Sequence, residues 1–134
     1  KKLIQIGELS SSISQIRHLK RGDKIGYDAM FICTKKMRVG IIPFGYADGL
    51  NRQLGNQKGS LAVNGKLCSI LGNISMDSCV IDLTESDAKE GDRVEIFGPN
   101  NNIDKICKQT HSIPYEFLSK INRRIKRIYN SSTS

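Results

Sequence analysis

The sequence predicts an all-β domain of mainly antiparallel strands in a barrel-like arrangement, with one or two short helices near the C-terminus. Short apolar segments separated by turn-forming residues recur up to about residue 100. Among them, Asn64-Gly65 splits two apolar arms, which is typical of a two-residue β-hairpin turn. In residues 102–121 the apolar residues are spaced at helical intervals instead, and residues 123–129, RRIKRIY, return to strand.

Six segments carry the strand signal. In residues 12–19, SISQIRHL, apolar and polar side chains partly alternate, as they do in a half-buried strand. The hairpin spans residues 61–71, because asparagine and glycine readily adopt the positive φ angles of a type I′ turn. The other strands are expected at residues 24–34, 39–46, 78–84 and 93–98.

The helical part of the sequence follows the last of these strands. Residues 102–110 predict a helix, because their apolar residues recur at helical spacing and Asn102 can cap its start. Residues 113–121 predict a second short helix. We expect one domain over residues 1–130 and a disordered tail over residues 131–134.

Length and composition are those of an ordinary globular domain. The 134 residues are 38% hydrophobic and 25% charged, which is enough for a hydrophobic core and does not favour disorder. No apolar stretch approaches the roughly 20 residues of a membrane span, and polar residues interrupt the N-terminus too early for a signal peptide. Because the chain lacks an initiator methionine, we expect it to be a piece of a longer polypeptide.

Cysteine spacing and charge narrow the classes of function. The four cysteines show no CxxC or metal-type pairing, so we expect reduced, buried thiols and a cytoplasmic location. The net charge is +8, and much of the excess lies in RRIKRIY at residues 123–129. A solvated strand face is the simpler explanation of this cluster, while a nucleic-acid patch stays open.

Three motifs are candidates for chemistry. In GYADG, two glycines around Tyr46 permit close approach of another molecule, although a structural turn is the simpler explanation. In SMDS, the backbone amide of Met76, beside Asp77, would lie near a strand end and could bind a carboxylate, although a core side chain is the simpler explanation of Met76. Tyr27 could act as a base only if a positive group or hydrogen-bond donors favoured its phenolate, and an ordinary packing tyrosine is the simpler explanation.

Taken in order, the motifs resemble the C-terminal domain of alanine racemase, the fold-type III pyridoxal-phosphate enzyme that interconverts L- and D-alanine. Tyr27 and Tyr46 stand 19 positions apart, as the pattern of this family requires. The resemblance runs from about residue 10 to residue 129, and the matching segments are GDKIGY, VGIIPFGYADGLNR, VNGKLCSILGNISMD, GDRVEIFG and SIPYEFLSKINRRIKRIY.

The resemblance implies a role for each matching residue. Tyr27 matches the catalytic base that removes the α-proton of L-alanine. Met76, next to Asp77, matches the residue whose backbone amide holds the substrate carboxylate, and both are expected to bind substrate. Tyr46 and Arg52 match residues that line the narrow substrate entrance.

Three further positions belong to the same comparison. Tyr115 matches a tyrosine that hydrogen-bonds the phosphate of the cofactor, pyridoxal 5′-phosphate, and Ile113 matches an apolar residue of the entrance. Asn73 stands where many members of the family have arginine, which leaves the charge of the outer entrance open. No metal site is expected.

The resemblance also implies that the other domain of the enzyme is absent from these 134 residues. The family's N-terminal α/β barrel carries the Schiff-base lysine, and 134 residues cannot also hold a barrel of about 250 residues. Because the family's active site forms between subunits, the expected partners are the chain's own barrel, a second subunit and alanine, with no nucleic acid and no membrane. The isolated chain is therefore expected to be inactive, whereas the full-length enzyme would supply D-alanine for peptidoglycan precursors.

Two other classes of function stay open. A small basic β-barrel could bind single-stranded nucleic acid by stacking bases on Phe31, Phe44 and Tyr46. That class would explain the net charge but not the ordered set of tyrosines and the Met76-Asp77 pair. The third class is a purely architectural dimerisation domain.

Overall fold

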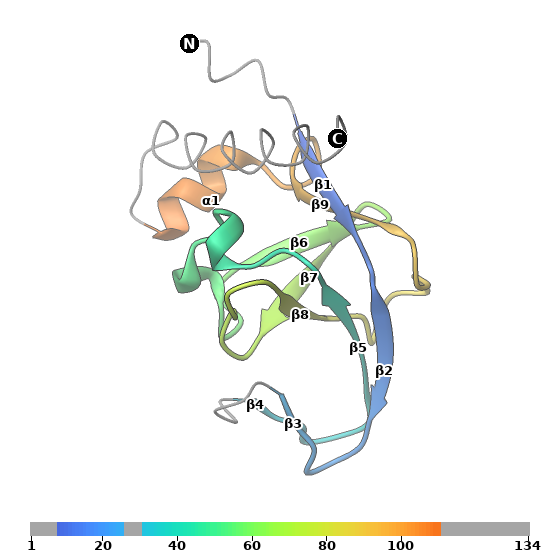
Figure 1. Ribbon diagram of the computed structural model, residues 1–134. Coiled ribbons are helices and arrows are strands. Elements are labelled where there is room, and N and C mark those ends of the chain that lie inside the picture. The colour runs from blue at the N-terminus through green and yellow to red at the C-terminus, as the bar shows by residue number, and fades with distance from the viewer. Residues whose placement is uncertain (1–7, 26–30, 111–134) are drawn as a thin grey trace, which may run out of the picture.

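Seven antiparallel strands form one curved sheet in the computed structural model, which describes residues 8–25 and 31–110 (Figure 1). The strand order is β1-β9-β6-β7-β8-β5-β2, and β3 and β4 form a separate pair. The elements are β1 (Leu9–Ser12), β2 (Gln15–Leu19), β3 (Lys24–Ile25), β4 (Phe31–Ile32), β5 (Met37–Ile42), the 3-10 turns η2 (Tyr46–Asp48) and η3 (Arg52–Leu54), β6 (Ser60–Val63), β7 (Lys66–Leu71), β8 (Cys79–Asp82), β9 (Arg93–Phe97) and the helix α1 (Ile103–Thr110).

The N-terminal segment joins the two edges of the sheet. Only Ile13 and Ser14 separate β1 from β2, yet β1 pairs with β9 at one edge and β2 pairs with β5 at the other. At the bend, Ile13 is 1% exposed and its carbonyl accepts a hydrogen bond of 2.8 Å from the Gly91 amide. The sheet therefore curves into a barrel-like shape, and the predicted all-β, mainly antiparallel fold is confirmed.

Apolar side chains of the inner face fill the barrel. Ile42, Ile70 and Ile81, on three adjacent strands, are fully buried in one cluster that also contains Val94 and Phe97. Each such side chain contributes roughly 1.5–3 kcal/mol relative to an exposed position. Successive side chains of a strand point to opposite faces of the sheet, and those that point to the inner face are buried.

The Asn-Gly hairpin is confirmed. Val63 pairs with Lys66, and Asn64 and Gly65 between them have φ angles of 52° and 80°. Positive φ at both central residues is the mark of a type I′ turn, whose twist matches that of the flanking strands.

The prediction of a single strand over residues 24–34 is wrong. Lys24 pairs with Ile32 and Ile25 with Phe31, so the two ends of the segment are antiparallel arms that face each other. Alternating apolar residues fit one long strand and two short arms equally well, because side-chain period carries no information on where a chain reverses. Residues 26–30, which join the arms, lie outside the described residues.

Two other predicted boundaries move for local reasons. The strand predicted at residues 39–46 ends at Ile42, because Pro43 has no N–H to donate to a neighbouring strand. The strand predicted at residues 12–19 is divided by the bend at Ile13.

The predicted helix near the C-terminus is confirmed as α1. The Asn102 side chain caps it by accepting a hydrogen bond of 2.7 Å from the Asp104 amide. The second helix, predicted at residues 113–121, and the strand predicted at residues 123–129 lie outside the described residues. None of the described helices is long and apolar enough to cross a membrane.

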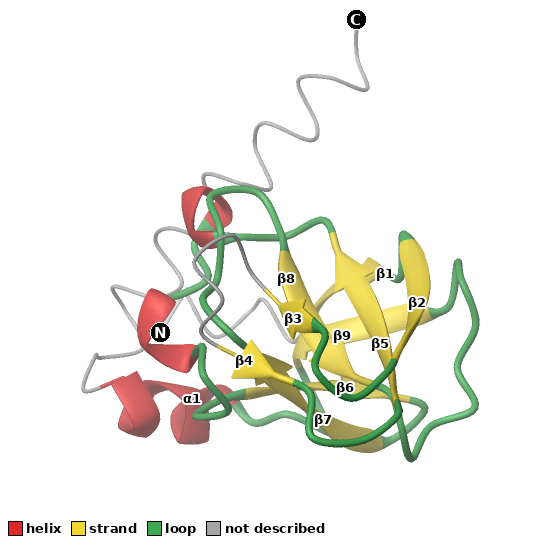
Figure 2. Ribbon diagram, turned by 90° about the horizontal axis from the view of Figure 1, so that it is seen from below, coloured by secondary structure: helices red, strands yellow, loops and turns green. Residues whose placement is uncertain are grey.

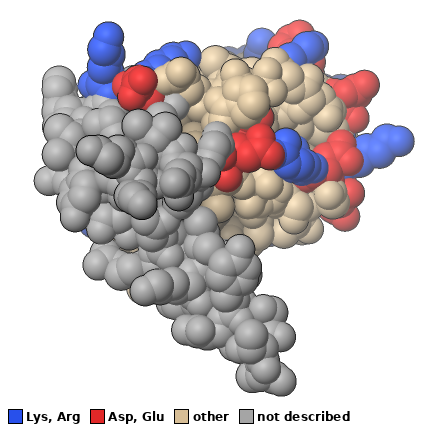
Figure 3. Space-filling view, turned by 90° about the horizontal axis from the view of Figure 1, so that it is seen from above, with Lys and Arg blue, Asp and Glu red and all other residues tan. Residues whose placement is uncertain are grey.

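Charge on the described surface is mixed in sign. On the face shown in Figure 3, lysine and arginine side chains lie beside aspartate and glutamate side chains. One such pair, Arg93 and Glu8, forms a salt bridge of 2.7 Å. The basic cluster at residues 123–129 is outside the described part of the chain.

Three cysteines are free and buried, as the sequence predicts: Cys33, Cys68 and Cys79. The side chain of Cys107 is outside the described part of the chain. Burial raises the pKa of the Cys79 thiol from 9.0 to about 12, because a thiolate would lose its hydration there.

We expect Cys79 to make the domain less stable as the pH rises above 9. The folded state keeps a proton that the unfolded state loses, so the free energy of unfolding falls by about 1.4 kcal/mol per pH unit between the two pKa values. Below pH 9 this contribution is fully present. Urea unfolding at pH 8 and pH 10 should therefore show a larger loss for the native chain than for Cys79→Val. Equal losses would contradict the raised pKa.

Candidate functional site

The two turns that carry the candidate motifs lie against each other. The Tyr46 amide donates a hydrogen bond of 3.0 Å to the Ser75 carbonyl, and the Ala47 amide donates one of 2.9 Å to the Met76 carbonyl. These bonds join GYADG to SMDS across about 30 positions of sequence. The contact brings Tyr46 and Met76, two of the predicted site residues, to the same rim of the barrel.

Strand register explains why the turns meet. β5 and β8 are antiparallel neighbours, and Ile42 at the end of β5 pairs with Cys79 at the start of β8. The segment that follows β5 and the segment that precedes β8 must therefore leave the sheet at one edge. Figure 2 shows the short helical segments gathered on one side of the strands.

Gly45 permits the close contact between the turns. A Cβ atom at this position would lie 2.4 Å from the Ser75 carbonyl oxygen and 2.5 Å from the Ser78 nitrogen. Its φ of −130° is open to any residue, so the requirement for glycine comes from the neighbouring backbone alone. The Asp48 carboxylate closes the turn by accepting a hydrogen bond of 3.0 Å from the Gly45 amide.

Ser75 and Ser78 shape the second turn. The Ser78 amide donates to the Ser75 hydroxyl at 3.2 Å, and that hydroxyl donates to the Ser78 carbonyl at 3.0 Å. The turn leaves Met76 57% exposed, which rules out a core role for its side chain, and Asp77 is exposed beside it. No described residue accepts a hydrogen bond from the Met76 N–H.

A cavity of about 260 Å³ lies next to the docked turns and is lined by Tyr46, Arg52, Gln53, Asn73 and Ile74. The Arg52 guanidinium carbon lies 5.0 Å from the centroid of the Tyr46 ring, within range of a cation–π contact. The two residues that were expected to line a substrate entrance are therefore in contact with each other. Asn73, the position that departs from the family pattern, is on the same wall.

The turn η3 contributes Arg52 and Gln53 to this wall, and the loop between η3 and β6 is bonded to Asn73. The Asn51 side chain caps η3 by accepting a hydrogen bond of 2.8 Å from the Gln53 amide. The Asn56 amide donates to the Gly72 carbonyl at 2.8 Å, and its side chain donates to the Asn73 side chain at 2.8 Å. Sequence reasoning missed Gln53, whose place on the cavity wall depends on the fold, and Asn56, whose partners Gly72 and Asn73 are distant in sequence.

The Ser75–Ser78 turn is another feature that sequence reasoning missed. Here the sequence did carry a signal, because two serines three positions apart can close a turn through their side chains. For Asn56 no such signal exists, since Asn73 is 17 residues away.

Two of the predicted site residues, Tyr27 and Tyr115, lie outside the described residues, as does Ile113. The position of β3 still bears on Tyr27. A Cβ atom at Gly72 would lie 3.3 Å from the carbonyl oxygen of Ile25, the last residue of β3. The chain two residues before Tyr27 therefore packs against the segment that leads to Asn73.

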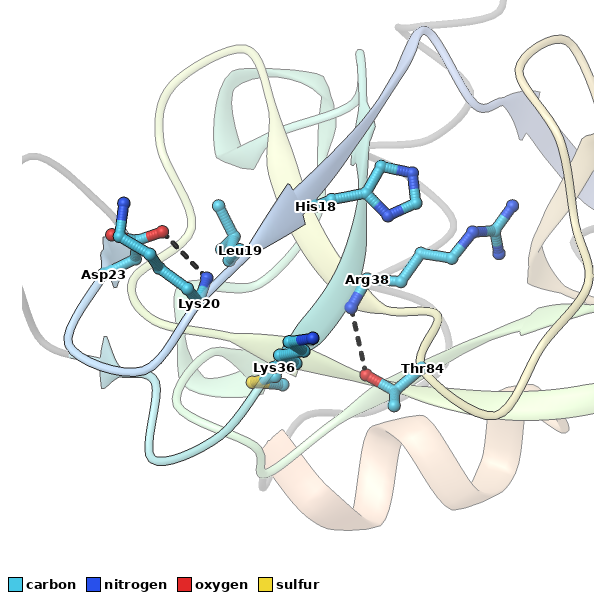
Figure 4. Close-up of a pocket in the computed structure, with 8 residues that line it drawn as sticks. His18, Leu19, Lys20, Asp23, Lys36, Arg38 and Thr84 are labelled. Carbon is cyan, nitrogen blue, oxygen red and sulfur yellow. Dashed lines mark hydrogen bonds between the residues drawn. The ribbon is translucent and has the colours of Figure 1, made fainter.

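A second cavity, of about 540 Å³, lies beside β2 and β5 and contains none of the predicted site residues (Figure 4). Three of its lining residues, Arg38, Thr84 and Asp23, are engaged in local structure. The Arg38 amide donates to the Thr84 hydroxyl at 3.2 Å, its guanidinium donates to the carbonyls of Ser86 and Ala88, and the Asp23 carboxylate accepts from the Lys20 amide at 2.9 Å. Within the described residues, no group of three or more side chains could hold a metal ion.

The described residues do not form the aromatic platform that nucleic-acid binding would need. Phe44 is only 2% exposed, and Phe31 packs against a smaller buried cluster that contains Ile25 and Leu71. Only Tyr46 of the three proposed stacking residues is exposed, and Arg52 already lies over its ring.

Comparisons with known proteins agree with this geometry. The family model described as "Alanine racemase, C-terminal domain" matches residues 6–129. Alanine racemase of Helicobacter pylori (strain Shi470) is 39% identical over 125 residues, covering 90% of this chain and 33% of the relative. Alanine racemase of Helicobacter acinonychis (strain Sheeba) is 36% identical over 131 residues, covering 95% of this chain and 34% of the relative.

Solved structures give the same result. The crystal structure of alanine racemase from Bartonella henselae with covalently bound pyridoxal phosphate matches with a TM-score of 0.81 at 35% identity, over 85% of this chain and 32% of that one. Alanine racemase from E. faecalis matches with a TM-score of 0.79 at 30% identity, over 87% of this chain and 32% of that one. The chain spans about a third of the length of these relatives. Since the family model covers nearly all of its residues, the chain belongs to the family of alanine racemase C-terminal domains.

Proposed function

We propose that this chain is the C-terminal domain of a pyridoxal-phosphate-dependent alanine racemase, and that it supplies a tyrosine base and a substrate-carboxylate contact across a dimer interface. The observation that carries the proposal is the docking of the 45–49 turn on the 75–78 turn. It gathers Tyr46, Arg52 and Met76 at one exposed rim, although 30 positions separate the first and last of these residues. A purely structural pair of turns would have no need of an exposed methionine.

Substrate binding is proposed for the rim. The Met76 N–H has no described acceptor, and a carboxylate oxygen could accept a hydrogen bond from it without a charged side chain at that point. Asp77 lies beside Met76, and Tyr46 with Arg52 would narrow the approach. The positive charge of Arg52 would attract the carboxylate as it enters.

Proton removal is proposed for Tyr27. A phenol has a pKa near 10, so it needs a nearby cation or hydrogen-bond donors to accept a proton readily near neutral pH. In this chain nothing adjacent in sequence supplies them, so they would come from the barrel domain of the partner subunit. Support comes from the contact between Ile25 and Gly72, because the last residue of β3 lies next to the segment that leads to Asn73.

This chain would provide only part of the binding site for pyridoxal 5′-phosphate, and other parts of the enzyme would provide the rest. No lysine is among the described residues that line the cavity, so covalent attachment would fall to the barrel domain. The Tyr115 hydroxyl would donate a hydrogen bond to the phosphate. When bound, the cofactor supplies an electron sink for the charge left after the α-proton departs.

The proposed partners are the chain's own barrel domain and a second subunit. Several large apolar side chains on the described surface are exposed, including Ile32 at 52%, Leu67 at 45% and Met76 at 57%. These side chains would be available for contact with the barrel domain or the second subunit. A cytoplasmic location and a role in supplying D-alanine for peptidoglycan go with the proposed enzyme.

The direct test compares this chain with the full polypeptide that contains it. With pyridoxal phosphate and L-alanine, the full polypeptide should form D-alanine, which chiral chromatography detects. The 134-residue chain alone should form none, because the second base and the lysine that attaches the cofactor would lie in the barrel domain. D-alanine from the isolated chain, or none from the full polypeptide, would contradict the proposal.

A further inference from the structure

We infer that Asn56 is a positioning residue that fixes the Asn73 amide on the wall of the Tyr46–Arg52 cavity, and that this amide pair tunes the entrance for a small amino acid with one carboxylate. The inference rests on the proposed function for its substrate, but its geometry is independent of that function. Its basis is the hydrogen bond of 2.8 Å from the Asn56 side-chain nitrogen to the Asn73 side-chain oxygen.

The backbone holds Asn56 in place for this bond. Its φ of 55° is in the left-handed region, and Gln57 follows with a φ of 68°. Two consecutive non-glycine residues in this region are strained and persist only where surrounding contacts fix them. Those contacts are the bonds from the Asn56 amide to the Gly72 carbonyl at 2.8 Å and from the Gln57 amide to the Ile70 carbonyl at 2.7 Å.

Close backbone packing removes the remaining freedom of the loop. A Cβ atom at Gly55 would lie 2.8 Å from the Gly72 carbonyl oxygen, so the chain just before Asn56 touches the chain just before Asn73. Both asparagine side chains thus project from segments whose backbones are joined. Asparagine tolerates the left-handed conformation better than most residues and also carries the donor, so one residue satisfies both demands.

The described cavity wall carries one positive charge beside neutral amides. Asn73 and Gln53 are neutral, and Arg52 is the one cation among the described residues that line the cavity. A single guanidinium with a fixed amide near it can pair with one carboxylate and keep that carboxylate's orientation. A ligand with two carboxylates would leave one of them without a positive partner on this wall.

A double-mutant cycle in the full polypeptide tests the inference. Asn56→Gly removes the amide and keeps the left-handed backbone accessible. We expect Asn56→Gly and Asn73→Ala each to raise KM for alanine by about 2- to 10-fold, the worth of one hydrogen bond, with kcat within about twofold. The double variant should be no worse than the poorer single variant. Gln57→Gly, the matched control at the neighbouring left-handed position, should leave KM unchanged.

A second readout does not depend on activity. In the polypeptide labelled with ¹⁵N-asparagine, Asn56→Gly should shift the side-chain amide resonance of Asn73, which its loss in Asn73→Ala identifies. Gln57→Gly should not shift it. An unshifted resonance, or KM effects that multiply in the double variant, would overturn the inference. If the native polypeptide formed no D-alanine, the proposed function would fail while the resonance still decided the role of Asn56.

Discussion

Replacing Gly45 by alanine is expected to destabilise the domain by about 3 kcal/mol, in the upper part of the range for overpacking a tight contact. The new methyl group would stand 2.4 Å from the Ser75 carbonyl oxygen and 2.5 Å from the Ser78 nitrogen. Both obstacles are backbone atoms, which cannot move aside as the end of a flexible side chain can. The two turns must therefore separate, and urea unfolding of the chain measures the cost.

The same change should reduce catalysis in the full polypeptide. Separating the turns breaks the bonds from Tyr46 to Ser75 and from Ala47 to Met76, and the Met76 N–H moves with its turn. A displacement of about 1 Å at a contact to the substrate can lower kcat/KM about 100-fold.

Gly65→Ala is the matched control. A Cβ atom at Gly65 meets nothing within 4 Å, so its cost is confined to the left-handed φ of 80°, about 1 kcal/mol, with no effect on kcat/KM. Normal stability and activity of Gly45→Ala would show that the two turns do not depend on each other.

Replacing Tyr27 by phenylalanine in the full polypeptide is expected to lower kcat by 10²- to 10⁴-fold, the range for loss of a general base. The ring and its packing are kept, and only the proton-accepting oxygen is removed. Absorbance of the bound cofactor should persist, because Tyr27 is not proposed to hold it. Steady-state formation of D-alanine from L-alanine gives the rate.

Hydrogen exchange in D₂O tests the face on which Tyr27 acts. If Tyr27 removes the α-proton of L-alanine, Tyr27→Phe should abolish the replacement of that proton by deuterium from the solvent. D-alanine should still exchange, because the opposite base of the proposed enzyme lies in the barrel domain. Exchange into both enantiomers at the native rate would refute the role of Tyr27.

Tyr46→Phe serves as the control for the loss of a tyrosine hydroxyl. Its ring can still lie against Arg52, so kcat/KM should fall by no more than about tenfold, the worth of one hydrogen bond. Exchange into both enantiomers should remain.

Local chemistry made parts of the fold predictable. The hairpin at Asn64-Gly65 was predicted because its turn type depends on two residues that tolerate positive φ. The helix at residues 103–110 was predicted because Asn102 caps it from within the same turn. The reversal between β3 and β4 was not, because an alternating segment looks the same in one strand and in two paired arms.

By itself, the sequence determined the all-β class, and its resemblance to the alanine racemase C-terminal domain pointed to Tyr46, Arg52 and Met76 as candidate residues. Only the tertiary structure decided that GYADG and SMDS touch, because the register of β5 against β8 joins segments about 30 positions apart. It also decided that glycine is required at position 45 and that Asn56 reaches Asn73. Such contacts depend on where the curved sheet brings distant backbones together, and no local pattern encodes that.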